Sequence, residues 1–246
     1  MSERGKWDGM LAIARFNWPF YATAFAVLLL AVLAFERFPL IASGAIAGCV
    51  YFLIGSLGVS HWVYDLSDLY RWTWLGRALR GSRLQEMVVC HSGFDEASAM
   101  LKQRFPEADW RVIDHYDPAT MTEASIRRAR RLFPPTEGTL PARFDAWPLA
   151  DSSVDVVFGM LAIHELRSDG ERVAWFAEAR RSLGEGGKVV VVEHLRDLAN
   201  FVAFGPGFMH FHSAATWRKS WESGGLKRVD DFRITPFVQV FVLEKS

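Results

Sequence analysis

The sequence has few cysteines and no excess charge of either sign, and both absences exclude classes of protein. Among its 246 residues, only Cys49 and Cys90 are cysteines, and they lie far apart. Two isolated cysteines provide neither a disulfide framework nor the paired thiols of a structural zinc site. Lysine and arginine together number 28, as do aspartate and glutamate, so the formal net charge is zero. The chain therefore lacks the basic surface that nucleic acids require, and we expect no nucleic-acid partner.

Charge is also missing from two long stretches near the amino terminus. No charged residue occurs from Trp18 to Phe35, and a second uncharged run extends from Phe38 to Tyr64. At about 1.5 Å per helical residue, the first run spans roughly 27 Å, close to the thickness of the hydrocarbon layer. Glu36, Arg37 and Pro39 separate the runs and favour a turn. We therefore expect a two-helix transmembrane hairpin over residues 18–64, preceded by a cytoplasmic segment over residues 1–17.

Two other interpretations compete with a membrane hairpin. A signal peptide fits poorly, because the first run is too long and ends in Phe-Glu-Arg-Phe instead of small residues. A buried pair of globular helices is the other alternative. Gly44 and Gly48 have the spacing that permits close helix approach, although glycines facing lipid fit the same pattern. A dimer through the hairpin is therefore possible, but the sequence does not define the oligomeric state.

Basic residues near the two runs predict the orientation of the hairpin. Arg4, Lys6 and Arg15 precede the first run, several arginines follow the second, and only Arg37 lies in the connection. Because positive charge is retained on the cytoplasmic side, both termini are expected there. The predicted location is the cytoplasmic (inner) membrane, with two passes and the large domain in the cytoplasm. Residues 65–83 mix aromatic, apolar and basic side chains, which predicts an amphipathic linker helix on the membrane surface.

The remaining residues, 84–246, show strand-like and helical segments in alternation. Strand-like segments occur at residues 87–90, 110–114, 142–145, 154–160, 188–193, 226–233 and 237–244. Helical segments are expected at 95–105, 121–132 and 169–183. Such alternation predicts an α/β fold with a mostly parallel, doubly wound sheet, and Pro236 makes the last two strands an antiparallel closing edge. Ligands of such sheets bind outside the carboxyl ends of the strands, where several histidines and carboxylates are predicted to gather.

The stretch from Phe144 to Leu166 carries a family resemblance. Asp145 ends one segment, Pro148 and a polar turn follow, and a buried strand then opens into a loop containing His164 and Glu165. This resembles the middle of class I S-adenosylmethionine-dependent methyltransferases, particularly the type 11 group that is similar to ubiquinone and menaquinone methyltransferases. The resemblance covers about residues 84–246. It implies a Rossmann-like fold, S-adenosyl-L-methionine as cofactor, and methyl transfer as the reaction.

The resemblance also implies which residues contact the cofactor. In the family, a glycine-rich loop follows the first strand, but here only Gly93 remains, and Cys90 or His91 replaces the usual acid. Asp114 matches the acid that binds the ribose, with Asp117 as a competitor that could instead cap the next helix. The implied cofactor-binding set is His91, Ser92, Gly93, Asp114, Tyr116, Asp117, Asp145, Ala146, Gly159, Met160 and Leu161.

Histidines and glutamates at the ends of the fourth and fifth strands are candidate catalytic residues, together with a histidine in the apolar segment that follows. These are His164 and Glu165, Glu193 and His194, and His210 in the later segment. They can serve as a general base, position a substrate, or ligate a metal, and a structural pairing of His164-Glu165 with Glu193-His194 is also open. The spacing matches no recognised metal signature, so no metal is expected.

The apolar segment 200–211 is predicted to form a lid suited to a lipophilic acceptor or to the bilayer. The preferred function is an integral membrane methyltransferase that modifies a lipophilic small molecule or lipid, such as a quinone, phenolic lipid, polyene or phospholipid. Two alternatives remain: a methyltransferase-like binding module with a decayed cofactor site, and a metal-dependent enzyme that uses the histidine and glutamate cluster.

Overall fold

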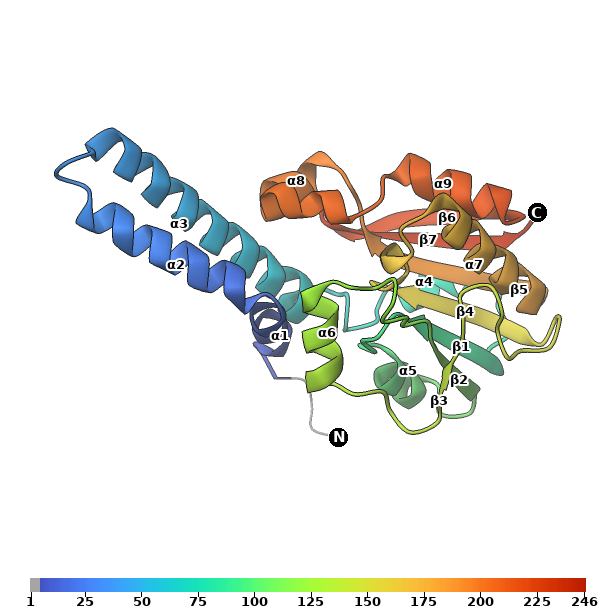
Figure 1. The fold of residues 1–246 in the computed structure, drawn as a ribbon. Coiled ribbons are helices and arrows are strands. Elements are labelled where there is room, and N and C mark those ends of the chain that lie inside the picture. Colours follow the sequence, from blue (N-terminus) through green and yellow to red (C-terminus); the bar gives the residue numbers. More distant parts are fainter. Residues whose placement is uncertain (1–4) are drawn as a thin grey trace.

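Two long apolar helices project from an α/β domain in the computed structural model, which describes residues 5–246 (Figure 1). Residues 1–4 lie outside the described residues, and they include Arg4, one of the basic residues that predict the orientation of the hairpin. The amino-terminal helices are α1 (Asp8–Phe16), α2 (Trp18–Leu33) and α3 (Pro39–His61), and the short helix η1 (Trp62–Leu66) continues α3. Pro39 is the first residue of α3, where its missing N–H costs no helical hydrogen bond. α2 and α3 run side by side as a hairpin (Figure 1).

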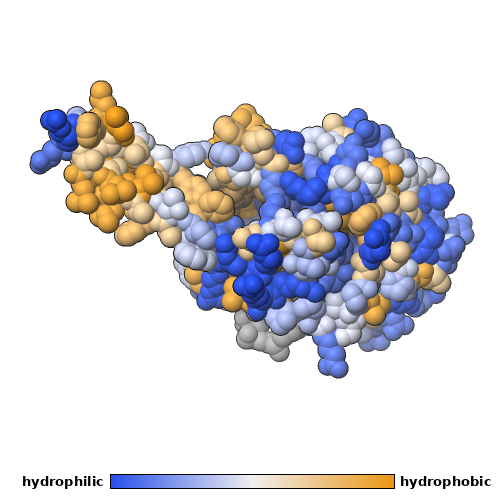
Figure 2. Space-filling view, viewed as in Figure 1, coloured by the Kyte–Doolittle hydropathy of each residue, from blue (hydrophilic) through white to orange (hydrophobic). Residues whose placement is uncertain are grey.

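The hairpin exposes apolar side chains along most of its length. Leu33, Leu40 and Ile41 are 73%, 88% and 74% exposed, and the hairpin contrasts with the more hydrophilic domain surface in Figure 2. Pro39–Leu66 is long and apolar enough to cross a membrane, with a mean hydropathy of 2.0 over its best window. α2 has 16 residues and reaches such a length only together with α1, across a bend of 80°. Among the described residues, one helix is therefore long and apolar enough by itself to span a membrane, whereas the sequence predicted two such helices.

Gly44 and Gly48 do not form the contact between α2 and α3. Both are exposed, and a Cβ atom added at either would have no heavy atom within 4 Å. The buried face of α3 carries Ala42 and Cys49 instead. The two glycines therefore face outward, as expected for lipid-facing positions.

A seven-stranded sheet forms the centre of the domain, in the order β3-β2-β1-β4-β5-β7-β6. Its strands are β1 (Glu86–His91), β2 (Asp109–Asp114), β3 (Thr139–Pro141), β4 (Val154–Met160), β5 (Leu183–His194), β6 (Leu226–Thr235) and β7 (Val238–Lys245). The first five strands pair in parallel, while β7 is antiparallel to both β5 and β6. The predicted mostly parallel sheet with an antiparallel edge is confirmed. The chain order reverses between β1 and β4, which makes their carboxyl ends the switch point where ligands of such sheets bind.

Helices and a long connection cover the two faces of the sheet. The remaining helices are α4 (Leu75–Ala78), α5 (Ser98–Arg104), α6 (Ala124–Leu132), η2 (Ile163–Glu165), α7 (Asp169–Ser182), α8 (Leu198–Phe204), η3 (Gly205–His210) and α9 (Ala214–Ser223). One face packs against large aromatic side chains of α7 and α9, including Trp175, Phe176 and Trp217. α7 begins with a capping box in which Ser168 and Glu171 bond each other's backbone N–H groups. The sequence did not predict α8 or α9 as helices.

The segment 65–83 differs from the surface helix that the sequence predicted. Only Leu75–Ala78 is α-helical, and the buried side chains of Leu69, Trp72 and Trp74 pack against the sheet with Val89 and Phe158. The aromatic residues of this segment cover the second face of the sheet, because that face would otherwise be exposed to water. The predicted strand at 142–145 also differs: β3 ends at Pro141, and the chain turns so that Arg143 pairs with Ala146.

Candidate functional site

The carboxyl ends of β1, β4 and β5 face the base of the helical hairpin across a cavity of about 610 Å³. α1, α2 and α3 contribute aromatic and hydroxyl side chains to it, and α6, α8 and η3 complete the wall. Its apolar part includes Phe16, Phe20, Phe52, Phe94, Phe204 and Phe211. His164, Glu165, His194 and His210 line its polar part. The fold thus brings four of the five predicted catalytic residues to one cavity.

Glu193 organises the loop that follows β4. Its side chain is fully buried, and Oε1 accepts hydrogen bonds from the backbone N–H groups of Ala162, Ile163 and His164 at 2.9–3.2 Å. Its Oε2 lies 2.7 Å from Nδ1 of His164. Because a carboxylate accepts, His164 donates through Nδ1 and keeps an electron pair on Nε2. Glu193 does not line the cavity, so it positions His164 from behind.

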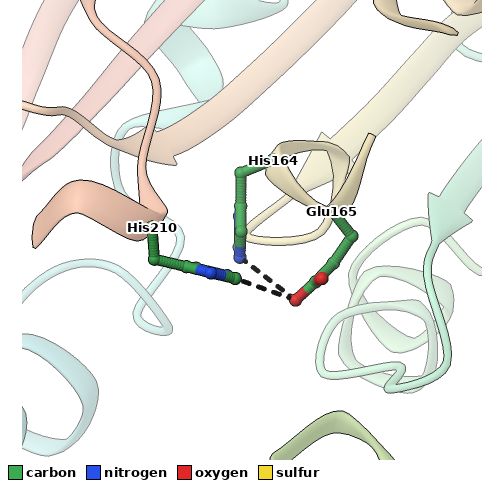
Figure 3. Close-up of side chains that lie close together, drawn as sticks. All are labelled: His164, Glu165 and His210. Carbon is green, nitrogen blue, oxygen red and sulfur yellow. Dashed lines mark ion pairs between the residues drawn. The ribbon is translucent and has the colours of Figure 1, made fainter. Parts of the chain in front are cut away.

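His164, Glu165 and His210 converge on one point of the cavity wall (Figure 3). Oε1 of Glu165 lies 3.6 Å from Nε2 of His164 and 3.4 Å from Nε2 of His210. Glu123, just before α6, places its carboxylate 3.0 Å from Nδ1 of His210. Burial opposes protonation of His210, but hydrogen bonds to Glu123 and Glu165 outweigh it and raise the pKa of His210 to about 9.

His194 lies in the same cavity but has different partners. The hydroxyl of Tyr64 is 2.9 Å from its Nε2, and the carbonyl oxygen of Phe237 is 2.9 Å from its Nδ1. The carbonyl accepts from Nδ1, so the tyrosine hydroxyl donates to Nε2 of a neutral ring. Burial is the main cause that lowers the pKa of His194 to about 4. His194 is therefore a neutral, hydrogen-bonded side chain at the cavity wall.

Asp114 ends β2 as predicted, but its carboxylate is occupied by the chain itself. Oδ1 accepts hydrogen bonds from the backbone N–H groups of Gly93 and Tyr116, at 2.9 and 3.0 Å. Oδ2 forms an ion pair with Arg130 of α6. The guanidinium of Arg130 also lies 4.5 Å from the ring centre of Tyr116. A ribose bound at Asp114 would have to displace Arg130.

Gly93 retains the conformation expected of a cofactor loop. Its φ is +96°, which favours glycine, but an added Cβ would meet the ring of Tyr116 at 2.8 Å. Tyr116 thus fills the space above the glycine. Beside it, Nε2 of His91 and Oγ of Ser92 are buried polar atoms with no hydrogen-bond partner among the described residues. Buried polar atoms without partners are uncommon and indicate a place for a ligand or water.

The other predicted cofactor residues are spread along the same sheet edge. Asp145 and Ala146 are exposed, and Asp145 forms an ion pair with Arg143 at 2.9 Å. Asp117 accepts a hydrogen bond from the N–H of Ala119 and so stabilises its own turn. Next to these, Trp147, Trp175 and His115 pack against one another in the core. The two residues predicted to contact adenine therefore lie at the surface, beside this aromatic cluster.

Gly159, Met160 and Leu161 form the end of β4. A Cβ at Gly159 would lie 2.6 Å from Ile163, so glycine permits the sharp turn into η2. Met160 is buried in the core, whereas Leu161 reaches the cavity with a φ of +49°. Of these three residues, only Leu161 lines the cavity, where a reacting group would lie.

The residues present fit S-adenosylmethionine at one end and not at the other. Nε2 of His91 and Oγ of Ser92 are unpartnered polar atoms that suit its amino-acid portion, although neither residue lines the cavity. At the ribose position, Arg130 pairs with Asp114, and Tyr116 covers Gly93. Binding of the whole cofactor therefore requires Tyr116 and Arg130 to move.

Several residues of the site were missed by the sequence reasoning. Tyr64 was assigned to the end of the second uncharged run of the hairpin, yet its hydroxyl bonds His194. Glu123 and Arg167 had no motif to mark them. Arg167 donates through Nη1 to the carbonyl oxygens of His210 and His164, at 2.6 and 3.2 Å, and so holds the two histidine segments together. Long-range contacts of this kind leave no local pattern in a sequence.

Comparison with known proteins identifies the fold. No protein-family model matches the chain, and no curated protein is similar to it in sequence. Among solved structures, a S-adenosylmethionine-dependent methyltransferase from Aquifex aeolicus superimposes with a TM-score of 0.52 at 15% identity, covering 74% of this chain and 95% of that one. The CcbJ methyltransferase from Streptomyces caelestis gives 0.51 at 15% identity, with coverage of 73% and 90%.

The mitomycin 7-O-methyltransferase MmcR matches over a longer part of the chain. Its TM-score is 0.52 at 14% identity, covering 99% of this chain and 74% of that one. At such identities, the similarity shows the fold, which is that of class I S-adenosylmethionine-dependent methyltransferases.

Proposed function

We propose that this protein is a membrane-embedded, S-adenosylmethionine-dependent methyltransferase whose acceptor is a lipophilic molecule taken from the bilayer. One observation carries the proposal: the cavity joins the aromatic base of an apolar hairpin to histidines and glutamates at the switch point of a methyltransferase sheet. A cavity that is apolar on one side and polar on the other suits a lipophilic molecule with a reactive polar end.

The exposed apolar surface of the hairpin supports membrane insertion. A surface of this kind on a monomer marks contact with lipid or a partner, and Glu36 and Arg37 lie at the tip, where charged side chains would emerge from the hydrocarbon. α8 adds apolar side chains beside α3, with Leu198 76% exposed and Val202 52% exposed. We place α8 at the membrane surface, which would let an acceptor pass from the bilayer into the cavity.

The side chains at the cavity wall suit the acceptor side of a methyl transfer. When bound, S-adenosylmethionine supplies an activated methyl group on its sulfonium. His164 is fixed by Glu193 and presents Nε2 beside Glu165, so it can accept a proton from a hydroxyl or an activated carbon acid of the acceptor. Phe204 and Phe211 line the cavity on the same side, and the ring of Phe211 lies edge-on to His164. We expect His91 and Ser92 to hold the amino-acid portion of the cofactor.

Methyl transfer can be tested directly with purified protein and extracted membrane lipids. The protein would be incubated with these lipids and with S-adenosylmethionine labelled in the methyl group. The label that enters the organic phase would then be counted. We expect transfer by the wild type and a loss of about 10²–10⁴-fold in His164→Ala, because a positioned general base contributes that much. Asp109→Ala, at the exposed start of β2, is the control and should retain full transfer.

A second candidate function follows from the closed ribose end of the site. Tyr116 lies over Gly93 and Arg130 is paired with Asp114, as in a domain that binds a lipophilic ligand but no cofactor. Such a binding module would carry lipid through purification, detectable by mass spectrometry, yet transfer no label. Transfer of label to any lipid fraction excludes it.

A further inference from the structure

The histidine and glutamate cluster at the cavity wall has a geometry that acid–base chemistry alone does not require. Nε2 of His164, Nε2 of His210 and a carboxylate oxygen of Glu165 lie within 4.8 Å of one another (Figure 3). The three residues come from two separate segments, η2 and the end of η3. Two imidazoles and one carboxylate are the donor set of many catalytic zinc sites and of mononuclear iron sites with open positions.

Both histidines also have the outer partners that metal-ligating histidines need. Nδ1 of His164 donates to Glu193, and Nδ1 of His210 lies 3.0 Å from Glu123. A carboxylate on the outer nitrogen fixes the ring and its tautomer and leaves the other nitrogen free to ligate. The Nε2 atoms of both rings lie beside Glu165, where the ion would replace the proton that His210 shares with that carboxylate, and neither Glu193 nor Glu123 is needed as a ligand.

We propose that His164, Glu165 and His210 bind one divalent transition-metal ion of the zinc or iron(II) type at the wall of the cavity. Three protein ligands leave at least one coordination position, which would face the cavity and accept an oxygen atom. Metal binding does not depend on the proposed function. The role of the ion, holding an enol or phenol oxygen of a lipophilic acceptor in its deprotonated form, rests on that function. It would replace proton transfer to Nε2 of His164, because a nitrogen that ligates the ion cannot also accept a proton.

The measured distances are compatible with such a site after a small contraction. Ligands at about 2.0–2.1 Å from a tetrahedral ion lie about 3.3 Å apart, and the distances from Glu165 to the two histidines are 3.4 and 3.6 Å. The two histidine nitrogens lie within 4.8 Å of each other and would have to approach to about the same separation. Arg167 opposes the ion, since its Nη1 lies 3.3 Å from Nδ1 of His210. Its charge is offset by the carboxylates of Glu123, Glu165 and Glu193.

Zinc binding by the full chain tests the site. Tag-free protein purified in detergent would be stripped with a chelator and titrated with zinc chloride, and bound zinc would be counted by elemental analysis. We expect one zinc ion per chain, and a loss of affinity of at least tenfold to a hundredfold in Glu165→Gln and His210→Gln. Glu123→Gln should weaken binding by a similar factor, because outer-shell partners matter to that degree. Asp109→Asn changes an exposed carboxylate at the start of β2, outside the cluster and outside the predicted cofactor site, and should bind zinc like the wild type.

Folding of each variant would be checked by its thermal melting temperature before and after zinc. A rise in melting temperature on adding zinc in the wild type and Asp109→Asn, absent in Glu165→Gln, supports the proposal. Failure of the wild type to retain one zinc overturns it, as does equal affinity in all variants. In that case the cluster is an ion-paired histidine between two glutamates.

A parallel assay separates this inference from the methyltransferase function. Methyl transfer by zinc-free protein that zinc does not enhance overturns the role of the ion while leaving the methyltransferase intact. If the protein binds one zinc ion tightly but binds no S-adenosylmethionine, the metal site is supported and the proposed methyltransferase function is refuted.

Discussion

Single residues decide whether this fold has a working site, and Glu193 is the most constrained of them. A fully buried carboxylate is stable only when its charge is compensated, and here three backbone N–H groups and His164 compensate it. Sequence reasoning grouped Glu193 with the catalytic residues. The structure makes it the support of His164 and of the η2 turn.

We predict that Glu193→Ala lowers the free energy of unfolding by about 3–5 kcal/mol, because it leaves three buried N–H groups and a histidine without an acceptor. Glu193→Gln should cost less, about 1–3 kcal/mol, since its amide oxygen still accepts from the backbone while its amide nitrogen faces the donor of His164. Urea unfolding in detergent measures both. An unchanged midpoint in Glu193→Ala would show that the η2 turn does not depend on this carboxylate.

His115 makes stability depend on pH. Trp175 donates to its Nε2 at 3.0 Å, so Nδ1 donates to the carbonyl oxygen of Ala142 and the ring is neutral. Burial is the main cause that lowers the pKa of His115 from 6.5 to about 4, with smaller opposing effects from Ala142 and Asp114 and a further lowering by His91. Between those pH values, the unfolded chain binds a proton that the folded chain does not, so stability falls as pH decreases.

We predict that acidification from pH 7 to 4 lowers the free energy of unfolding by up to about 3 kcal/mol through His115 alone. His115→Gln should be less stable at pH 7 but show a shallower dependence on pH. Trp175→Phe removes the hydrogen bond to Nε2 yet keeps the buried imidazole, so it should retain most of the slope, because burial is the main cause of the lowered pKa. Equal slopes in the wild type and His115→Gln would refute the assignment.

At the scale of elements, the connection between hairpin and sheet is part of the core. Trp74 is 7% exposed and donates a hydrogen bond from Nε1 to the carbonyl of Leu69. Its ring packs near Trp72 and Phe232, which join the connection to the sheet. The connection therefore fixes the base of the hairpin to the domain that carries the site.

We predict that Trp74→Ala costs about 3–5 kcal/mol of folding free energy, as expected for a large buried aromatic side chain. Trp18→Ala is the matched control, because Trp18 is 58% exposed and its loss should change stability little. Thermal unfolding in detergent compares the two. Equal effects would mean that the connection does not pack on the domain.

The elements differ in how far the sequence predicts them. Val154–Met160 was predicted to the residue because a fully buried strand is an uninterrupted apolar run. The segment 65–83 has the composition of a surface helix, yet its tryptophans are buried, since composition does not reveal which apolar surface a segment covers. The sequence placed His164, Glu165 and His210 near the same edge of the sheet but did not predict that their side chains touch. The contacts of Glu123, Tyr64 and Arg130 depend on how helices pack, which no local pattern shows.

At the scale of the whole molecule, the proposed function requires the hairpin and the domain to act at one membrane surface. The cavity lies between them, so an acceptor in the bilayer and a cofactor in the cytoplasm would meet where the histidines are. The same arrangement explains why the aromatic wall is built from α1, α2 and α3 as well as from the domain.

We predict that a reporter fused after Ser246 is active only in the cytoplasm, and that one inserted between Glu36 and Arg37 is active only on the opposite side. The retention of basic residues on the cytoplasmic side is the physical reason. A tip reporter that is active in the cytoplasm would contradict a spanning hairpin and indicate one that only dips into the membrane.

Binding of S-adenosylmethionine to the full chain tests the central claim most directly. Calorimetric titration of the cofactor into detergent-purified protein should show one saturable site. Asp114→Ala should weaken it by about ten- to a hundredfold, because a charge-assisted hydrogen bond to the ribose is lost. Arg130→Ala, which frees Asp114 from its ion pair, should bind at least as well as the wild type. Absence of binding in both the wild type and Arg130→Ala would contradict the account and leave a methyltransferase fold that binds no cofactor.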